Sequence, residues 1–207
     1  MGSEIIFIFA LIIAVTAVYW IVLKCAAEKI AAQYQLLAER FGLELNQSAV
    51  KMRGFIRSEP SVFGTYRDRE MSISVPGKGL QNTRQIESVL KLELKGSQLS
   101  AQLTAAGPLG GLRQRDSGGQ ARWKSGDERF DHAVDVRTNQ GEALTALLTE
   151  ERRIWLTGTL KKSKATLYIG GGNLAYAKLG LIANEATRKD FEAATEFLCD
   201  LAESVEA

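Results

Sequence analysis

The chain has 207 residues and a formal net charge of +2 at pH 7. It contains two cysteines, Cys25 and Cys199, and one histidine, His132. Two cysteines so far apart exclude a disulfide framework and a zinc cluster with Cys/His spacing. The single histidine restricts any histidine-dependent catalysis to one position.

An apolar run near the N-terminus is the strongest signal in the chain. Residues 5–23 carry no charge, and Thr16 is their only aliphatic polar side chain. As a helix with about 1.5 Å of rise per residue, this run measures about 28 Å, close to a hydrocarbon core of about 30 Å. The opening MGSE has no basic side chain, and Lys24 precedes Cys25, so neither a cleaved signal peptide nor a lipoprotein signal fits. We expect residues 1–24 to form an uncleaved anchor that spans the lipid bilayer through residues 5–23.

The flanks of the apolar run indicate its orientation. Tyr19 and Trp20 lie near its C-terminal end, where aromatic belt residues occur, and Lys24 and Lys29 follow. The N-terminal flank carries Glu4 and no basic side chain. By the positive-inside rule, we expect a single-pass membrane protein whose C-terminal domain is cytoplasmic.

Residues 25–42 are expected to form a juxtamembrane helix, because apolar residues recur at helical spacing and Gly42 supplies a stop. This spacing favours packing on the chain's own domain. It also fits a short heptad seam, so a homo-oligomer formed through residues 30–41 is an alternative. The apolar stripe consists of Ile30, Tyr34, Leu37, Ala38 and Phe41.

The middle of the chain has the pattern of short strands. Polar and apolar residues alternate in 61–75, with Arg69, Met71 and Ile73 on one face and Glu70, Ser72 and Ser74 on the other. Residues 89–95 place Leu90, Leu92 and Leu94 inward. The alternation resumes in 97–104 after Gly96, which predicts a hairpin. Further strands are expected at 130–136, 153–160 and 165–169.

Glycines at 170–172 predict a flexible turn, followed by an apolar segment, 174–182, that is either another strand or an exposed patch. Residues 142–151 predict a short amphipathic helix. A longer helix is expected after a capping box at Thr187 and Asp190, with an apolar face that covers the sheet. That face consists of Phe191, Ala194, Thr195, Leu198, Leu201, Ala202 and Val205. Segments 76–84 and 105–128 are expected to be loops.

These elements predict an α+β fold: an N-terminal transmembrane helix, then a mostly antiparallel sheet covered by a C-terminal helix. The soluble α+β domain is expected to span residues 43–207. FGTYRDREMSISV and DERFDHAVDV, followed by ALLTEERRIWL, give the chain a layout that resembles uncharacterised bacterial single-pass membrane proteins with such a domain. The resemblance implies no activity.

Three residues form the best centre for an enzymatic site: Asp127, Asp131 and His132. In a strand, however, His132 shares a face with the apolar Phe130 and Val134, away from the nearest carboxylates. A core or edge histidine is therefore favoured over a catalytic base. We predict no catalytic residues, no metal site and no cofactor, since the glycine turn lacks the spacing of phosphate-binding or dinucleotide-binding loops.

Charge distribution gives one positive signal. Residues 183–207 are acidic, whereas basic residues gather in 51–69, 113–129 and 161–164. Tethered beside an anionic leaflet, each properly placed cation contributes about 1 kcal/mol. The residues predicted to bind are Arg113, Arg115, Arg122, Trp123 and Lys124. A single loop aromatic makes a poor stacking platform, so a nucleic-acid partner is not expected.

The favoured function is a membrane-anchored binding or scaffolding module that meets a partner protein or the anionic inner leaflet. The alternatives are an enzyme with a site near Asp127, Asp131 and His132, and a structural subunit of a membrane complex.

Overall fold

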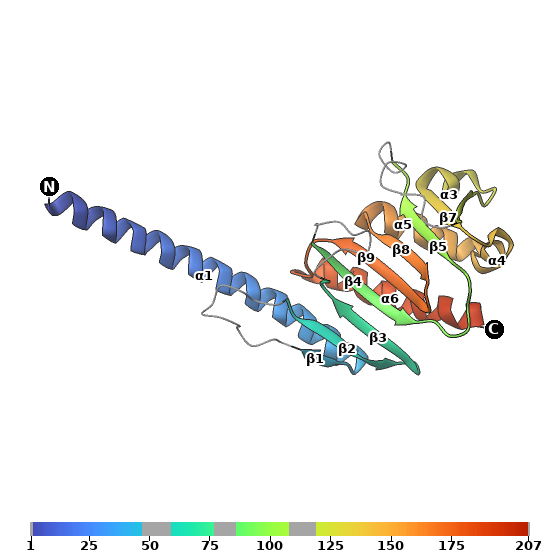
Figure 1. The fold of residues 1–207 in the computed structure, drawn as a ribbon, viewed down its shortest axis with the longest axis horizontal. Coiled ribbons are helices and arrows are strands. Elements are labelled where there is room, and N and C mark those ends of the chain that lie inside the picture. Colours follow the sequence, from blue (N-terminus) through green and yellow to red (C-terminus); the bar gives the residue numbers. More distant parts are fainter. Residues whose placement is uncertain (1, 47–58, 77–85, 108–118, 207) are drawn as a thin grey trace.

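The computed structural model describes residues 2–46, 59–76, 86–107 and 119–206. Its fold is α+β: a long N-terminal helix, an antiparallel sheet and a C-terminal helix (Figure 1). The helices are α1 (Gly2–Phe41), α3 (Glu128–Ala133), α4 (Gly141–Leu147), α5 (Glu150–Ser163) and α6 (Glu185–Glu206). The strands are β1 (Glu44–Asn46), β2 (Ser61–Tyr66), β3 (Arg69–Ser74), β4 (Glu87–Glu93), β5 (Ala101–Ala105), β6 (Ala121–Trp123), β7 (Val134–Thr138), β8 (Thr166–Gly170) and β9 (Asn173–Leu179).

One sheet contains all nine strands, in the order β1-β2-β3-β4-β9-β8-β5-β7-β6. Every pair of neighbouring strands is antiparallel, as predicted. The C-terminal half of α1 packs on one face of this sheet together with α5 and α6, and the three helices share a core with the sheet. In Figure 1 the N-terminal part of α1 projects away from that body.

Helix α1 has two halves with different surroundings. Its apolar N-terminal half is exposed, whereas the predicted stripe of the second half is buried in the core, with Tyr34 and Leu37 fully inaccessible. These stripe residues therefore pack within the chain, in the arrangement that the sequence favoured over a seam between copies. The helix ends as predicted: Gly42 takes a left-handed φ of +65°, and the Leu43 N–H donates to the Ala38 carbonyl at 2.9 Å.

Segment 61–75 is a hairpin of β2 and β3, and the predicted alternation is confirmed by the burial of Met71 and Ile73. Its two turn residues, Arg67 and Asp68, both have positive φ, at 48° and 58°. Two-residue hairpin turns of this kind match the twist of the strands and usually contain Asn or Gly. Here an arginine and an aspartate occupy these two positions.

The predicted hairpin across Gly96 is wrong. Strand β4 pairs with β3 and β9, whereas β5 pairs with β7 and β8. Alternation identified both strands and the inward face of Leu90, Leu92 and Leu94, which are at most 3% exposed. Alternation carries no information about which strand lies alongside. In the sheet, the β8–β9 hairpin lies between β4 and β5.

Two segments predicted as strands are helical. Residues 153–160 lie within α5, whose N-cap Thr149 accepts a hydrogen bond from the Arg152 N–H at 3.5 Å. Leu156 and Leu160, one helical turn apart, are its buried residues. Residues 130–133 lie in α3, and only from Val134 does the chain become the strand β7. The predicted helix 142–151 is α4 for its first part and ends at Leu147.

Helix α6 begins before the predicted capping box. The Asn184 side chain accepts the Thr187 N–H at 2.8 Å, so Asn184 is the capping residue and Thr187 lies inside the first turn. The predicted apolar face is confirmed: Phe191, Ala194 and Leu198 are inaccessible and pack on the sheet, where Phe191 meets Tyr176 edge to face. The glycine turn is also confirmed, as the link between β8 and β9.

Candidate functional site

Of the predicted binding residues, Arg122 and Trp123 lie in strand β6 and Lys124 follows it directly, while Arg113 and Arg115 lie outside the described residues. Segment 105–128 is thus not a single loop, since it contains an edge strand that pairs with β7. The Arg122 Nε lies 2.9 Å from Asp135 Oδ1, and Trp123 packs against Gly141 and the core. A local partner offsets the Arg122 charge, and the indole serves packing, whereas Lys124 is exposed.

The candidate acidic centre is built into a turn. Asp127 Oδ1 accepts the N–H groups of Arg129 and Phe130 at 3.0 and 3.3 Å, as the N-cap of α3. Asp131 accepts the backbone N–H groups of Ser125 and Gly126. Both carboxylates therefore bind backbone N–H groups of the turn at residues 125–130.

His132 was predicted to share a face with the apolar residues, and this is wrong. It lies in the last turn of α3 and is exposed, because the helix turns its side chain away from the direction that a strand would give. Over the described ranges, no group of three His, Cys, Asp or Glu side chains is placed to hold a metal ion.

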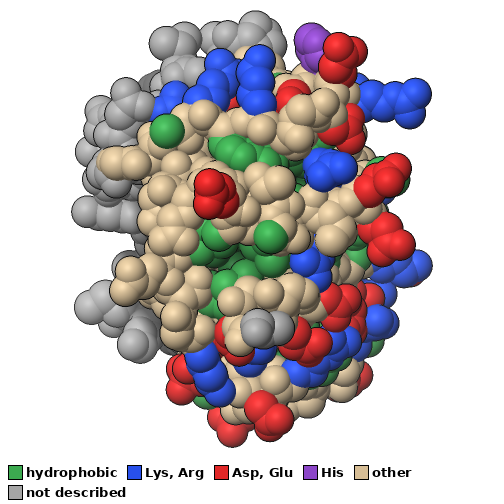
Figure 2. Space-filling model, turned by 90° about the vertical axis from the view of Figure 1, so that its right-hand side faces the viewer, with side chains coloured by type: hydrophobic (Ala, Val, Ile, Leu, Met, Phe, Trp, Pro, Cys, Tyr) green, Lys and Arg blue, Asp and Glu red, His purple; other side chains and the backbone are tan. Residues whose placement is uncertain are grey.

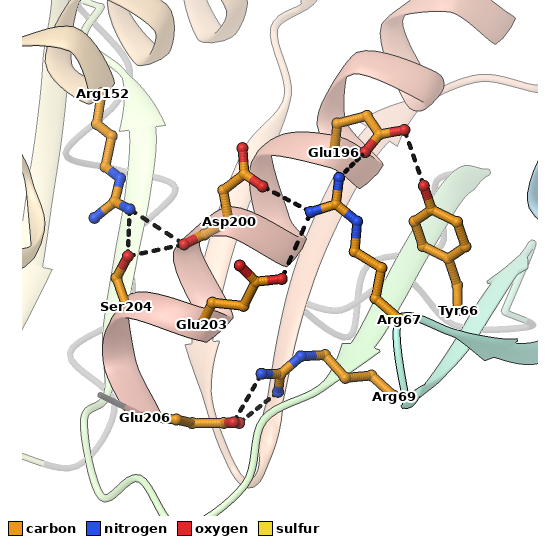
Figure 3. A network of polar contacts seen from close by, with 9 residues as sticks. All are labelled: Tyr66, Arg67, Arg69, Arg152, Glu196, Asp200, Glu203, Ser204 and Glu206. Carbon is orange, nitrogen blue, oxygen red and sulfur yellow. Dashed lines mark hydrogen bonds and ion pairs between the residues drawn. The ribbon is translucent and has the colours of Figure 1, made fainter.

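A polar network joins the β2–β3 turn to the C-terminal half of α6 (Figure 3). Arg67 contacts three carboxylates: Glu196 and Asp200 at 2.7 and 2.8 Å, and Glu203 at 3.6 Å. The Tyr66 hydroxyl also donates to Glu196, at 3.1 Å. The strained turn is thus held by the acidic face of α6.

Arg69 forms the most buried part of this network. It is 7% exposed and donates through two nitrogens to Glu206, with Nη2 2.7 Å from Oε2. The Lys95 N–H donates to the same carboxylate at 2.6 Å. The guanidinium holds the pKa of Glu206 at about 2, well below its usual range.

A second network joins α1 to the N-terminal half of α6. The Arg188 Nε donates to Gln33 Oε1 at 3.2 Å, and Arg40 lies 3.4 Å from Glu192, which also pairs with Arg188. The order of these contacts means that α1 and α6 run in the same direction. The start of α6 therefore lies at the end of the domain from which the apolar segment departs.

Helix α5 runs opposite to α6, since Arg152 contacts Ser204 whereas Lys162 lies 4.0 Å from Asp190. Its last turn consequently lies beside the first turns of α6. We call this region the anchor-side end; it comprises residues 161–164 and 185–192 with their contacts on α1. The opposite region, with the β2–β3 turn, α4 and the last turns of α6, is the far end.

The far end is shallowly hollowed. Figure 2 views this end, where hydrophobic side chains gather near the middle and charges of both signs surround them. A hollow of about 340 Å³ lies between the link that follows β4, α4 and α6. Its lining is formed by Gly96, Ser97, Gln98, Leu99, Gln140, Ala143, Ala146, Leu147, Ser204 and Val205.

Sequence reasoning missed both polar networks, although a signal was present. Glu203 and Glu206 stand in the last turns of α6, where the negative end of the helix dipole disfavours carboxylates. Acids in that position indicate cationic partners from elsewhere in the chain. The basic group 51–69 contained those partners, Arg67 and Arg69.

No protein-family model and no curated protein matches the chain. Among solved structures, the crystal structure of the mycobacterial trehalose monomycolate transport factor A, TtfA, is similar, with a TM-score of 0.58 and 12% sequence identity. The similarity covers 83% of this chain and 93% of that chain. At this identity the likeness shows a shared fold.

Proposed function

We propose that this chain is a single-pass, membrane-anchored binding module that acts without catalysis as an accessory factor of a membrane transport system. Its α+β domain would stand on the cytoplasmic side and meet a partner protein there. The fold shared with a mycobacterial transport factor supports the transport context.

The continuity of α1 carries the proposal. One uninterrupted helix runs from Gly2 to Phe41 and is long and apolar enough to cross a membrane. The large apolar side chains of residues 6–23 are 48–71% exposed, a surface that water disfavours and a bilayer accommodates. Ile30, only seven residues after Leu23, is already buried in the domain.

The short distance between anchor and domain gives the module its mechanism. Seven residues of helix span about 10 Å, so the domain is held close to the bilayer surface without a flexible linker. Such tethering raises the effective concentration of the domain for a partner in the same membrane. A partner contact is thereby strengthened without any additional interface.

The orientation rests on Lys24 and Lys29, which follow the apolar segment. A compartment-sensitive reporter fused after Ala207 tests it, and we expect activity on the cytoplasmic side. The same fusion should stay in the membrane fraction after alkaline extraction. Release by alkali would refute the anchor, and activity on the opposite side would refute the orientation alone.

Partner binding needs a separate experiment in intact cells. A photo-crosslinking amino acid at Ala146, in the far-end hollow, is compared with the same amino acid at Lys91, an exposed position of β4. We expect a discrete adduct from one or both positions, lost when Ile13→Lys and Val15→Lys interrupt the apolar segment. Failure of both positions to form any discrete adduct in membranes would contradict the binding-module proposal.

A further inference from the structure

The anchor-side end is the part of the domain that lies nearest to the apolar segment. Gln33, which binds Arg188, comes ten residues after Leu23 and therefore about 15 Å farther along α1. The headgroup layer beyond the hydrocarbon core takes up about 5–8 Å of that distance. Lysine side chains at this end thus have only a narrow aqueous gap to cross.

Cations outnumber carboxylates at the anchor-side end. Asp190 lies between two lysines, 2.7 Å from Lys178 and 4.0 Å from Lys162. Glu192 is likewise shared by two arginines. The cationic side chains are Arg40, Lys161, Lys162, Lys164, Arg188 and Lys189, with Lys178 of β9 beside them, against the carboxylates Glu185, Asp190 and Glu192.

The last turn of α5 presents its charges to solvent. The Lys162 side chain is 80% exposed, and Lys161 and Lys164 are exposed as well. In the part of the chain that the structure describes, no ion pair involves Lys161 or Lys164. Lys164 caps the helix with a left-handed φ of 52°, a position where glycine is usual.

The charge differs between the two ends of α6. On its C-terminal half, Glu196, Asp200 and Glu203 converge on a single arginine, Arg67. The positive excess therefore faces the side from which the anchor leaves. An anionic membrane surface would attract that end and repel the carboxylates of the other.

We propose that Lys161, Lys162 and Lys164 bind the phosphate-bearing headgroups of anionic lipids and so set the direction in which α1 tilts. This inference rests on the membrane anchor of the proposed function and identifies its lipid contact. Membrane helices tilt by about 20° on average, and electrostatic attraction reaches about 8–10 Å at physiological salt. Since α1 is built into the domain core, a tilt toward α5 brings these lysines to the headgroups.

This lipid contact on α5 differs from the one predicted from the sequence, which included Arg122 and Lys124. Arg122 is offset by Asp135, whereas Asp190 is itself shared between Lys162 and Lys178. Each cation at a membrane surface contributes about 1 kcal/mol, which corresponds to about a fivefold preference. Three lysines on one turn therefore suffice to select one tilt direction over others.

The test places a fluorophore on α5 of the full chain. Gly158 is exposed, and a Cβ added there meets no atom within 4 Å, so Gly158→Cys is tolerated. Cys25→Ser removes the exposed native thiol, while burial raises the pKa of the Cys199 thiol to about 11 and keeps it unreactive. The labelled chain is reconstituted in phosphatidylcholine vesicles with and without phosphatidylglycerol, each containing a headgroup-linked quencher.

We expect phosphatidylglycerol to increase at least fivefold the part of the quenching that high salt removes. In the chain without charge reversals, high salt should therefore reverse the increase. Reversal of the three α5 lysines to Glu should abolish the increase. A control with the same change in charge at other exposed positions, Lys91→Glu with Lys124→Glu and Arg129→Glu, should retain it.

Quenching that does not change with phosphatidylglycerol or with salt would overturn the inference. Loss of the increase in the control variant alone would overturn it as well. Alkaline extraction of the same vesicles separates this failure from that of the proposed function. A chain that stays in the bilayer without lipid-dependent quenching refutes only the lipid contact. A chain that is extracted refutes the anchor as well.

Discussion

The ion pair between Arg69 and Glu206 should contribute more to stability than the other contacts of the far end. Glu206→Gln removes the anion and leaves a guanidinium that is 7% exposed without a charged partner. Besides the neutral amide oxygen of the substituted side chain, its remaining acceptor in the described chain is the Glu93 carbonyl at 3.5 Å. Breaking a buried pair from one side costs more than the pair itself contributes, because the remaining charge stays desolvated.

The expected loss is about 2 kcal/mol. Hydrogen bonds to charged groups make a net contribution to stability of about 1.5–3 kcal/mol each. The pKa of Glu206, lowered from 4.5 to about 2, sets a ceiling of about 3 kcal/mol. Solvent reaches the carboxylate, whose side chain is 21% exposed, so screening brings the figure below that ceiling.

Urea unfolding of the full chain in lipid nanodiscs, followed by near-ultraviolet circular dichroism, measures the loss. Glu203→Gln is the matched control, because that carboxylate is 57% exposed and 3.6 Å from Arg67; its loss should stay below about 0.5 kcal/mol. Adding Arg69→Met to Glu206→Gln should restore part of the stability, since no buried charge then remains.

The stabilisation should also depend on pH. The folded pKa of Glu206 lies below its unfolded value, so the unfolded chain binds more protons as the pH falls below about 4.5. The contribution is complete above that pH and disappears toward pH 2. Equal losses for Glu206→Gln and Glu203→Gln at pH 7, or a difference that persists unchanged to pH 2, would refute the reasoning.

Three further substitutions probe the elements that position the domain, by the same unfolding measurement. Asn184→Ala should cost about 1 kcal/mol while Thr187→Ala costs little, because Asn184 caps α6; the reverse order would restore the capping box predicted from the sequence. Gly42→Ala should destabilise by about 1 kcal/mol through its positive φ, and an unchanged midpoint would contradict the helix stop. Leu156→Ala should cost about 3 kcal/mol and Ile154→Ala under about 0.5, since the first is buried and the second 66% exposed; similar losses would contradict this difference in burial, and the reverse order would mean that α5 faces the other way.

Local pattern determined most of the elements but not the partner of each strand. The alternation of 89–95 identified an inward face, and the glycines at 170–172 identified a turn. The hairpin predicted across Gly96 failed because period-2 alternation is satisfied by any neighbour that offers an apolar face. Pairing was decided by β9, which offers Leu174 and Tyr176 to β4.

Segment 153–160 illustrates a helix and strand ambiguity that end signals resolve. Its apolar residues fit either period, yet Thr149 followed by Glu150 and Glu151 marks a helix start, and Lys161 and Lys162 mark a helix end. Capping and dipole terms thus contained information that periodicity alone did not. Lys161 and Lys162 are also two of the three lysines proposed to contact lipid.

The sequence by itself determined the apolar helix, its stop at Gly42, the antiparallel α+β class and the apolar face of α6, because each depends on residues close together in the chain. Only the tertiary structure decided which charges meet. Arg69 and Glu206 are brought together by the packing of a hairpin on a distant helix, and Lys162 reaches Asp190 because α5 runs opposite to α6. The sequence gives the net charge of each segment, whereas the fold determines where on the surface positive and negative side chains gather. That distribution depends on contacts between distant residues, which no local pattern encodes.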